Sequence, residues 1–517
     1  MQTYFYNLAG GINQAASKMA LGLDTKKLYW TDSKNIEILQ NNGIIRQNGN
    51  VEVASLEEPD EIIGLHPLKD DVTYNILIAT KSGKLFVYET KSQTLVQLEK
   101  TIDGSERINF VDFLDGVVVG GKNTPLFYMN NDDGYPIEEC NLKDSNSKDI
   151  LADIICVYAG RIWVAAGSTL FYSALGTYDD FESENDAGYI NNFHTDTNDI
   201  TALKTYKEYL AIYKESSVYL LSGTNNKDFS VTPFADKGTS SFSGVANINN
   251  KQYFINEGVF SLEQAGLLSQ IQLGEEISLK IKPEFEKFDK TRMNEIIVIH
   301  YEAKNQVWYF IPYQNEKYFH TVWIYNYIND AWFKRVIPQN ITTACLVNGN
   351  ILTADASGKL YKEDFGSTFS GQPIEFLWKS PFLASGDSNI RKTVEEFYFM
   401  LDESYDNNFN FSVYKNYDSE YKDDEDSIHS TNLENLIWAT EETSLENNFY
   451  WKIDSEDDAE ILPEAVIYSV WATGSNSIYK AEISESNYSV QLCVEGNSIN
   501  QGVAIIGLEF KEIYLDT

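Results

Sequence analysis

The side chains that most often do chemistry are few and scattered in this chain of 517 residues. A zinc protease places two histidines four residues apart on a helix with a glutamate between them, and no pair of histidines here has that spacing. The cysteines contain no Cys-x-x-Cys pair, so we expect buried free thiols rather than disulfides or a zinc site. The residues concerned are His66, His194, His300, His320 and His429, with Cys140, Cys156, Cys345 and Cys493.

Acidic side chains are abundant, but their spacing identifies no catalytic or metal site. The segment Asn130–Gly134 resembles a calcium-binding loop. Alignment on Gly134 puts Met129 at the first ligand position, so we predict a turn instead. Nucleophile-elbow and P-loop signatures are also absent. We therefore predict a protein that is not an enzyme, with no catalytic, cofactor-binding or metal-binding residue and with no cofactor.

The elements that would position such side chains follow a repeat. An aliphatic strand ends in a turn, and a short polar step leads to a branched aliphatic residue followed by an aromatic one. Successive copies lie 41, 44, 48, 41, 63 and 38 residues apart. Strand-like repeats with a period in the forties are typical of a β-propeller, so we predict about seven blades, and six to eight fit the spacing. The pairs are Leu85-Phe86, Leu126-Phe127, Leu170-Phe171, Val218-Tyr219, Val259-Phe260, Val322-Trp323 and Leu360-Tyr361.

The repeat predicts how an all-β chain is divided. Residues 61–366 are expected to form the propeller, whose last blade ends near Phe365 without an outer strand. Because an open blade leaves an unpaired edge, we expect a strand within Ile44–Val53 to close the ring, carried by an N-terminal arm of residues 1–60. The regular period stops near Gly371. Residues 371–517 are predicted to form a C-terminal β-sandwich domain, with the acidic run Asp418–Asp426 as a solvated loop.

The charge balance limits the partners of this protein. The net charge is −37, from 77 acidic and 40 basic residues. Affinity for nucleic acids or anionic membranes needs clustered lysine and arginine, so ordinary binding to either is not expected. One interpretation is solubility through self-repulsion; another is a surface that lies near DNA without retaining it. No apolar run reaches the length of a membrane span and no signal peptide is visible, so we expect no membrane anchor.

Several stretches resemble the tail nozzle proteins of short-tailed bacteriophages, also called packaged-DNA stabilization or tail tube proteins. Leu8–Asn13 resembles the Gly-Gly-Leu-Asn-like start of that family. Asn35–Glu37 and Gly43–Arg46 resemble the stretch and the strand that follow this start. Tyr253–Phe260 resembles one of its blade strands, and the junction Ser380–Lys392 is similar to the one before its C-terminal sandwich. A hairpin common in phage tail proteins is also matched. The residues that match this hairpin are Asn305–Trp308, Val322–Tyr327 and Ala331-Trp332.

The resemblance implies a structural virion protein that forms a ring, a homohexamer in this family, below the portal and adaptor proteins of the tail. Its partners would be copies of itself, the portal or adaptor, tail fibre or other tail proteins, and double-stranded DNA in transient, non-specific passage. It would assemble in the host cytoplasm and end in the phage tail of the virion. An acidic channel would keep the duplex centred during ejection, because each neutralised phosphate would add affinity.

Two other classes of function stay open. A receptor- or carbohydrate-binding propeller, such as a viral adhesin, would use exposed tyrosine and tryptophan, although aromatic residues inside strands more often pack between blades. A polysaccharide-degrading propeller enzyme would need a pair of carboxylates. The 77 acids offer too many pairs to single one out.

Overall fold

The computed structural model describes residues 2–21, 26–69, 74–132, 134–140, 142–143, 149–182, 186–193, 196–265, 270–383, 392–402, 404–416, 424–430, 477–487 and 489–514. Almost all of the described elements are β-strands, as predicted. The chain divides into two compact units. One comprises Asn48–Gln372 and is called the propeller unit below. The other combines Met1–Gln47 with Pro373–Thr517 and is called the terminal unit.

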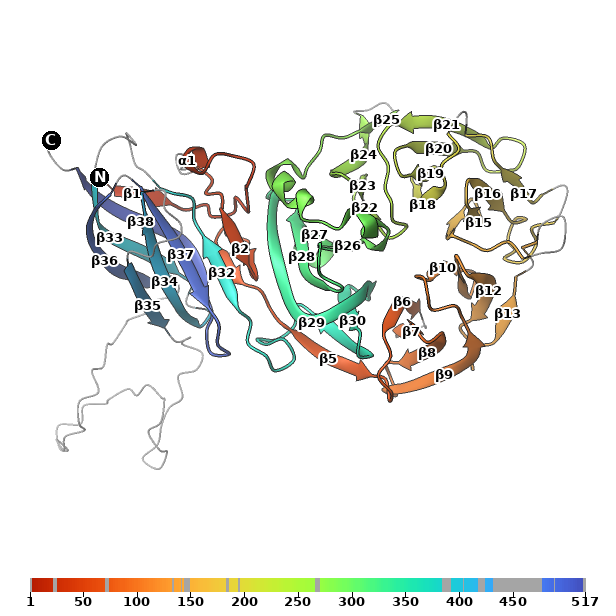
Figure 1. Ribbon diagram of the computed structural model, residues 1–517, viewed down its shortest axis with the longest axis horizontal. Coiled ribbons are helices and arrows are strands. Elements are labelled where there is room, and N and C mark those ends of the chain that lie inside the picture. The colour runs from red at the N-terminus through yellow and green to blue at the C-terminus, as the bar shows by residue number, and fades with distance from the viewer. Residues whose placement is uncertain are drawn as a thin grey trace. The chain divides into compact units, whose positions relative to one another are not determined.

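Most of the propeller unit consists of four-stranded antiparallel sheets (Figure 1). In these sheets the strands pair in chain order, so each sheet folds from one continuous segment. The strands are β6 (Ile62–Lys69), β7 (Tyr74–Thr80), β8 (Lys84–Glu89) and β9 (Thr94–Thr101); β10 (Asn109–Phe113), β11 (Gly116–Gly121), β12 (Thr124–Asn130) and β13 (Ile137–Glu139); β14 (Ile154–Tyr158), β15 (Arg161–Ala166), β16 (Thr169–Tyr172) and β17 (Gly188–Ile190); β18 (Ile200–Tyr206), β19 (Tyr209–Lys214), β20 (Val218–Ser222) and β21 (Ser230–Ala235); and β22 (Val245–Ile248), β23 (Lys251–Ile255), β24 (Val259–Ala265) and β25 (Gln270–Leu273).

The composition of these strands explains their burial. The second strand of each sheet is rich in β-branched and aromatic residues and is buried on both faces, as in β11 and β15. Such runs favour strands whose two faces are both covered. The hydrophobic clusters lie between consecutive sheets, for example where Leu77 and Val87 share a cluster with Val117 and Phe127. Each sheet therefore buries its faces against its neighbours.

One sheet of the propeller unit contains seven strands, because β29 is long enough to pair in two places. The first half of β29 pairs with β28 and its second half with β30. At the edge, β5 pairs with β31 in antiparallel register. The strand order is β26 (Ile297–Tyr301), β27 (Gln306–Phe310), β28 (Phe319–Asn326), β29 (Ala331–Val347), β30 (Asn350–Asp355), β31 (Lys359–Glu363) and β5 (Asn50–Ser55).

The N-terminal part of the chain is shared between the two units. We expected one closing strand within Ile44–Val53, and the structure has two strands there. β5 lies at the edge of the propeller sheet. Residues Ile44–Arg46 form β4, which pairs with β3 and β38 of the terminal unit. The division between the units falls after Gln47, so the expected arm of residues 1–60 is split between the two units.

The longest step of the repeat, 63 residues, has a structural cause. Between β25 and β26 the chain forms the 3-10 helices η1 (Leu279–Glu286) and η2 (Lys290–Glu295). Another short 3-10 helix, η3 (Glu302–Lys304), follows β26. No helix that the structure describes has the length and hydrophobicity needed to cross a membrane.

The terminal unit contains two sheets, and both ends of the chain contribute to them. One sheet has the order β3-β4-β38-β33-β36, with β1 paired to β38, and the other has the order β2-β32-β37-β34-β35. Phe399 of the first sheet contacts Phe409 and Phe411 of the second, with ring centroids 5.8 and 5.2 Å apart. The elements are β1 (Gln2–Phe5), α1 (Lys18–Leu21), β2 (Asp32–Lys34), β3 (Ile36–Ile38), β4 (Ile44–Arg46), β32 (Phe376–Lys379), β33 (Lys392–Leu401), β34 (Asn407–Lys415), β35 (Asp424–Ser430), β36 (Ser477–Asn487), β37 (Val490–Gly496) and β38 (Ala504–Tyr514).

The acidic run Asp418–Asp426 was predicted to be a solvated loop, and this is wrong for its last residues. Asp424–Asp426 begin β35, where they pair with Phe411–Val413 of β34. Residues 418–423 lie outside the described part of the chain. β35 is the last strand in the order of its sheet. Charged residues are common on such edges because they discourage pairing with other chains.

Leu114 is a strained residue in the turn between β10 and β11, and it provides a first prediction. Its φ is 51°, and its side chain is 63% exposed. A left-handed backbone costs most L-residues about 1–2 kcal/mol, whereas asparagine tolerates it. Asparagine occupies the corresponding turns after β22 and β29, at Asn249 and Asn348, with φ values of 53° and 46°.

We therefore expect Leu114→Asn to raise the free energy of unfolding of the propeller unit by about 1 kcal/mol. The measurement is denaturant unfolding followed by tryptophan fluorescence. Leu114→Ala serves as the control, because alanine removes the exposed side chain without relieving the backbone. Equal stability of the two variants would contradict the strain argument.

Candidate functional site

The sheets of the propeller unit surround a central cavity of about 620 Å³ that is open to solvent. Its lining comes from β6, β10, β14, β18, β22 and β26, the first strands of their sheets, and from the second half of β29. Figure 1 shows β6, β10, β18, β22 and β26 nearest the centre of this unit. The central cavity therefore depends on all of these sheets together, and no single segment of sequence contains it.

The wall of the central cavity is mixed, with polar and apolar surface in similar amounts. Several of its aliphatic residues, such as Ile108, Ile154 and Ile155, are buried and belong to the hydrophobic clusters between the sheets. The apolar lining residues include Ile63, Leu65, Ile108, Phe110, Ile154, Ile155, Leu203, Phe242, Val245, Ile297, Val298, Ile299 and Leu346.

Two histidines contribute to the central cavity. The Nε2 atom of His66, in β6, lies 2.7 Å from a carboxylate oxygen of Asp112. The imidazole ring stacks on the ring of Phe110, with centroids 5.5 Å apart. His300 of β26 has Nε2 3.3 Å from the hydroxyl of Tyr327. Burial lowers the pKa of His300, which favours the neutral imidazole at pH 7. Among the residues that the structure describes, no group of three or more His, Cys, Asp or Glu side chains is arranged to hold a metal ion.

The charged lining includes two cations, Arg107 and Lys204. The Nη2 of Arg107 donates to the carbonyl oxygen of Thr342 at 3.1 Å, and the guanidinium lies 5.6 Å from the ring centroid of Phe319. Burial lowers the pKa of Arg107 to about 10; Glu295 opposes this shift and Arg292 adds to it. Arg107 still carries its charge at pH 7 in a poorly hydrated position.

Cys156 and Cys345 also line the central cavity. All four cysteines are free thiols; Cys156 and Cys493 are buried as expected, whereas Cys140 and Cys345 are only half-buried. Burial raises the pKa of Cys156 to about 11 and that of Cys345 to about 12. Because the thiolate is the reactive form of cysteine, neither side chain is activated as a nucleophile near neutral pH.

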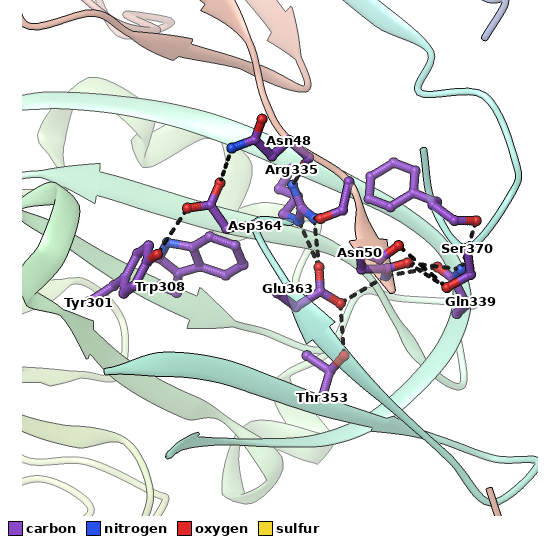
Figure 2. Close-up of polar contacts among 12 residues, drawn as sticks. Asn48, Asn50, Tyr301, Trp308, Arg335, Gln339, Thr353, Glu363, Asp364 and Ser370 are labelled. Atoms are coloured by element: carbon purple, nitrogen blue, oxygen red, sulfur yellow. Dashed lines mark hydrogen bonds and ion pairs between the residues drawn. The ribbon is translucent and has the colours of Figure 1, made fainter. Parts of the chain in front are cut away.

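A separate set of polar side chains, which we call the closure cluster, lies where β5 pairs with β31 (Figure 2). It includes Arg335 of β29 and Glu363 of β31. Nε and Nη2 of Arg335 donate to the Glu363 carboxylate at 3.1 and 2.6 Å. The side chains of this ion pair are 1% and 0% exposed. The guanidinium also donates to the carbonyl oxygens of Asn48 and Gly49 at 2.7 and 2.8 Å. Arg335 thus binds the segment that leads into β5.

Neighbouring side chains complete the closure cluster. The other carboxylate oxygen of Glu363 accepts hydrogen bonds from Asn50 of β5 at 3.0 Å and from Thr353 of β30 at 2.8 Å. Asp364 accepts from the hydroxyl of Tyr301 at 2.9 Å. Figure 2 shows these contacts converging on β5 from the surrounding strands. Since the polar groups satisfy one another, the closure cluster acts as a structural joint.

The other residues considered from the sequence lie elsewhere. His320, in β28, has Nδ1 3.3 Å from the carbonyl oxygen of Ile337. His429 belongs to β35, and His194 lies outside the described residues. Asn130 donates to the Asp132 carboxylate at 2.9 Å and accepts from its backbone N–H at 3.2 Å, as in a hydrogen-bonded turn.

The central cavity was not predicted from the sequence. His66, Arg107, Lys204 and His300 are far apart in the chain, and each lies in or next to an ordinary strand pattern. Their shared feature is their position on the first strand of a repeat or, for Arg107, just before it. An alignment of the repeats by their first strands would have placed them at one centre.

Comparisons with known proteins assign no family to this chain. No protein-family model matches the sequence, and no curated protein matches it. Among solved structures, the computationally designed Ika8 protein is similar over 60% of this chain and 99% of its own, with 11% identity and a TM-score of 0.34. The WD40 β-propeller domain of Doa1 is similar over 61% of this chain and 96% of its own, with 9% identity and a TM-score of 0.39.

Proposed function

We propose that this chain is a structural virion protein, a nozzle ring of a short-tailed phage that attaches below the portal or adaptor and retains and conducts DNA. The observation that supports this most directly is the acidic surplus of a protein in which several cations are also paired with its own acids. The net charge is −37. A wall of this kind repels a duplex, while a basic wall would retain it.

Ion pairs of the structure show how the cations are used. Buried Arg161 donates to Asp186, and buried Lys214 donates to backbone carbonyls and lies 3.5 Å from an Asp196 oxygen. On the surface, lysines are matched by nearby carboxylates. Among the described residues, such pairs include Lys81–Glu61, Lys100–Glu139, Lys251–Glu263, Lys280–Asp330, Lys282–Glu276, Lys317–Glu61 and Lys359–Glu52. Pairing of this kind reduces the number of lysines available to phosphates and leaves the remaining acids in excess.

The DNA would pass through a channel formed by several copies of the chain. The central cavity of one propeller unit, at about 620 Å³, has the volume of a small-molecule pocket. It is too small for a duplex whose major groove alone is about 12 Å wide. We therefore propose a homohexameric ring, as the family resemblance implies, which contacts portal or adaptor proteins and other tail proteins.

We also propose the finer architecture. The propeller has seven blades, because seven strand segments line the central cavity and the seven-stranded sheet divides at β29 into two sets of four. In this scheme β29 supplies the outer strand of one blade and the inner strand of the next, and β5 closes the ring. The two sheets of the terminal unit form a β-sandwich, which the contacts of Phe399 with Phe409 and Phe411 support.

The ring state and the behaviour toward DNA test this proposal together. We expect mass photometry to find particles whose mass is a multiple of the 58.8 kDa chain, and negative-stain electron microscopy to show rings with an open centre. We expect a filter-binding assay at low salt to retain no linear duplex DNA, because the acidic excess outweighs any phosphate contact. A basic DNA-binding protein in the same assay is the control. A chain that stays monomeric at high concentration, is absent from virions, or binds duplex DNA would overturn the proposal.

A receptor- or carbohydrate-binding propeller is the second candidate, and one observation favours it. A cavity of about 370 Å³ in the propeller unit is lined by Tyr74, Tyr88, Thr90, Asn348 and Asn350, among others. Aromatic rings beside amides and hydroxyls suit a sugar, since one face of a sugar is apolar and its edge is polar. Saturable binding on a glycan array that is lost in Tyr74→Ala would favour this candidate over the nozzle.

A further inference from the structure

We propose that one face of the propeller unit binds a segment of a partner protein through two exposed leucines, Leu114 and Leu175, and that this segment is both aliphatic and basic. We call the two leucines and the surrounding acids Asp115, Asp179 and Glu208 the turn patch. The side chains of Leu114 and Leu175 are 63% and 59% exposed. Burial of such side chains against a partner removes apolar surface from water. The proposal does not depend on the nozzle function.

Leu114 and Leu175 lie at the same end of their sheets. When four antiparallel strands pair in chain order, the turn after the first strand and the turn after the third strand lie at one end of the sheet. Leu114 follows β10, a first strand, and Leu175 follows β16, a third strand. The turn after β16 also contacts the turn after β14, since the backbone N–H of Gly176 donates to the carbonyl oxygen of Gly160 at 2.9 Å.

The turns of neighbouring sheets adjoin, so the two leucines belong to one surface. Phe113, which precedes Leu114, packs in the same hydrophobic cluster as Ile155 of β14 in the next sheet. On the other side, the hydroxyl of Tyr158, at the end of β14, donates to the carbonyl oxygen of Glu208 at 2.8 Å. Glu208 lies in the turn after β18. The turn patch therefore spans three consecutive sheets.

Backbone strain at Leu114 indicates that leucine serves a purpose other than stability there. Its φ of 51° is in the left-handed region, which asparagine tolerates and which Asn249 and Asn348 occupy in the corresponding turns. An exposed leucine gains little from packing, so neither burial nor the turn geometry accounts for this residue type. Strained residues of this kind gather at binding and catalytic sites, where the rest of the fold offsets their cost.

The charges of the turn patch determine the chemistry of the partner. Asp115, Asp179 and Glu208 are exposed, and they form no ion pair with any residue that the structure describes. Lys207, beside Glu208 in the chain, donates to Gln264 instead. A second copy of this face would bring acids against acids, which is unfavourable. A segment with lysine or arginine beside aliphatic side chains would cover the leucines and pair with the acids.

A short labelled peptide that alternates leucine and lysine, titrated by fluorescence anisotropy, tests this proposal. We expect saturable binding of this peptide, no binding when glutamate replaces its lysines, and weaker binding when serine replaces its leucines. Leu114→Asn should weaken binding of the leucine–lysine peptide about tenfold, because a central apolar contact is lost. The same change relieves the strained turn, so a loss of folding would not explain the result. Leu175→Asn should weaken binding in the same direction.

Leu279→Asn is the matched control. Leu279 is 57% exposed and follows β25, the last strand of its sheet, so it lies at the opposite end from the turn patch. This variant should bind the leucine–lysine peptide like the unmodified protein, and circular dichroism verifies that each variant is folded. Unchanged affinity in Leu114→Asn, or an equal loss in Leu279→Asn, would overturn the proposal. Equal binding of the serine–lysine peptide would also reject it, because charge alone would then account for the binding.

Discussion

Replacing Arg335 by methionine should lower the free energy of unfolding of the propeller unit by about 3–5 kcal/mol, because it leaves the buried Glu363 carboxylate without its counterion. The two side chains are 1% and 0% exposed, so water cannot compensate the loss. Glu363 would retain the donors of Asn50 and Thr353, which are neutral. The segment before β5 would also lose the guanidinium that binds its carbonyl oxygens at Asn48 and Gly49.

In Arg335→Met we expect β5 to unfold locally before the whole propeller unit unfolds. β5 is the last strand in the order of its sheet, where it pairs with β31, so it should detach first when the closure cluster is broken. Hydrogen exchange with mass spectrometry should show faster exchange in Asn50–Ser55 and Lys359–Glu363 than in the other strands. Denaturant unfolding gives the total change in free energy for the same variant.

Two further variants make this prediction specific to burial. Lys359→Met breaks an ion pair with Glu52 across the same two strands, but those side chains are 41% and 38% exposed. Exposed pairs contribute about 0–1 kcal/mol, so this matched control should change little. The double variant Arg335→Met with Glu363→Leu should be less destabilised than the sum of its single changes, since no unpaired charge remains. Equal effects of Arg335→Met and Lys359→Met would show that the closure cluster does not hold the edge.

Replacing Trp332 by alanine should cost about 3–5 kcal/mol, because a fully buried indole leaves a large cavity. Its ring packs near those of Tyr309 and Tyr325, with centroids 5.3 and 4.8 Å away. Its Nε1 donates to the carbonyl oxygen of Ile277 at 3.0 Å. Ile277 precedes η1, so Trp332 also holds the long excursion between β25 and β26 against the sheet.

The contributions of packing and hydrogen bonding can be separated. Trp332→Phe keeps most of the apolar volume and loses the bond to Ile277, so its cost should be clearly smaller than that of alanine. Ile328→Ala changes a side chain that is 68% exposed in the adjacent turn and should have an effect within about 0.5 kcal/mol. Chemical denaturation monitored by circular dichroism gives the three values. A loss under 1 kcal/mol in Trp332→Ala would contradict the packing described here.

The all-β class and the repeat were readable from the sequence, because alternation and turn residues are local properties. Each copy of the pattern, such as Leu85-Phe86 or Leu170-Phe171, lies in a strand of the propeller unit. The acidic excess was equally evident, since it needs only the composition. The spacing of the cysteines indicated free thiols, but it did not show that Cys140 and Cys345 would be only half-buried.

Other features depend on contacts between distant parts of the chain, and only the tertiary structure decided them. Alternation around Gly49 gave no sign that Ile44–Arg46 and Asn50–Ser55 belong to different units. The pairing of Arg335 with Glu363, and the gathering of residues from distant strands around the central cavity, follow from how the sheets close around a centre. Strand patterns specify which residues are extended and buried, whereas partners across a sheet or a cavity are set by the packing of the whole unit.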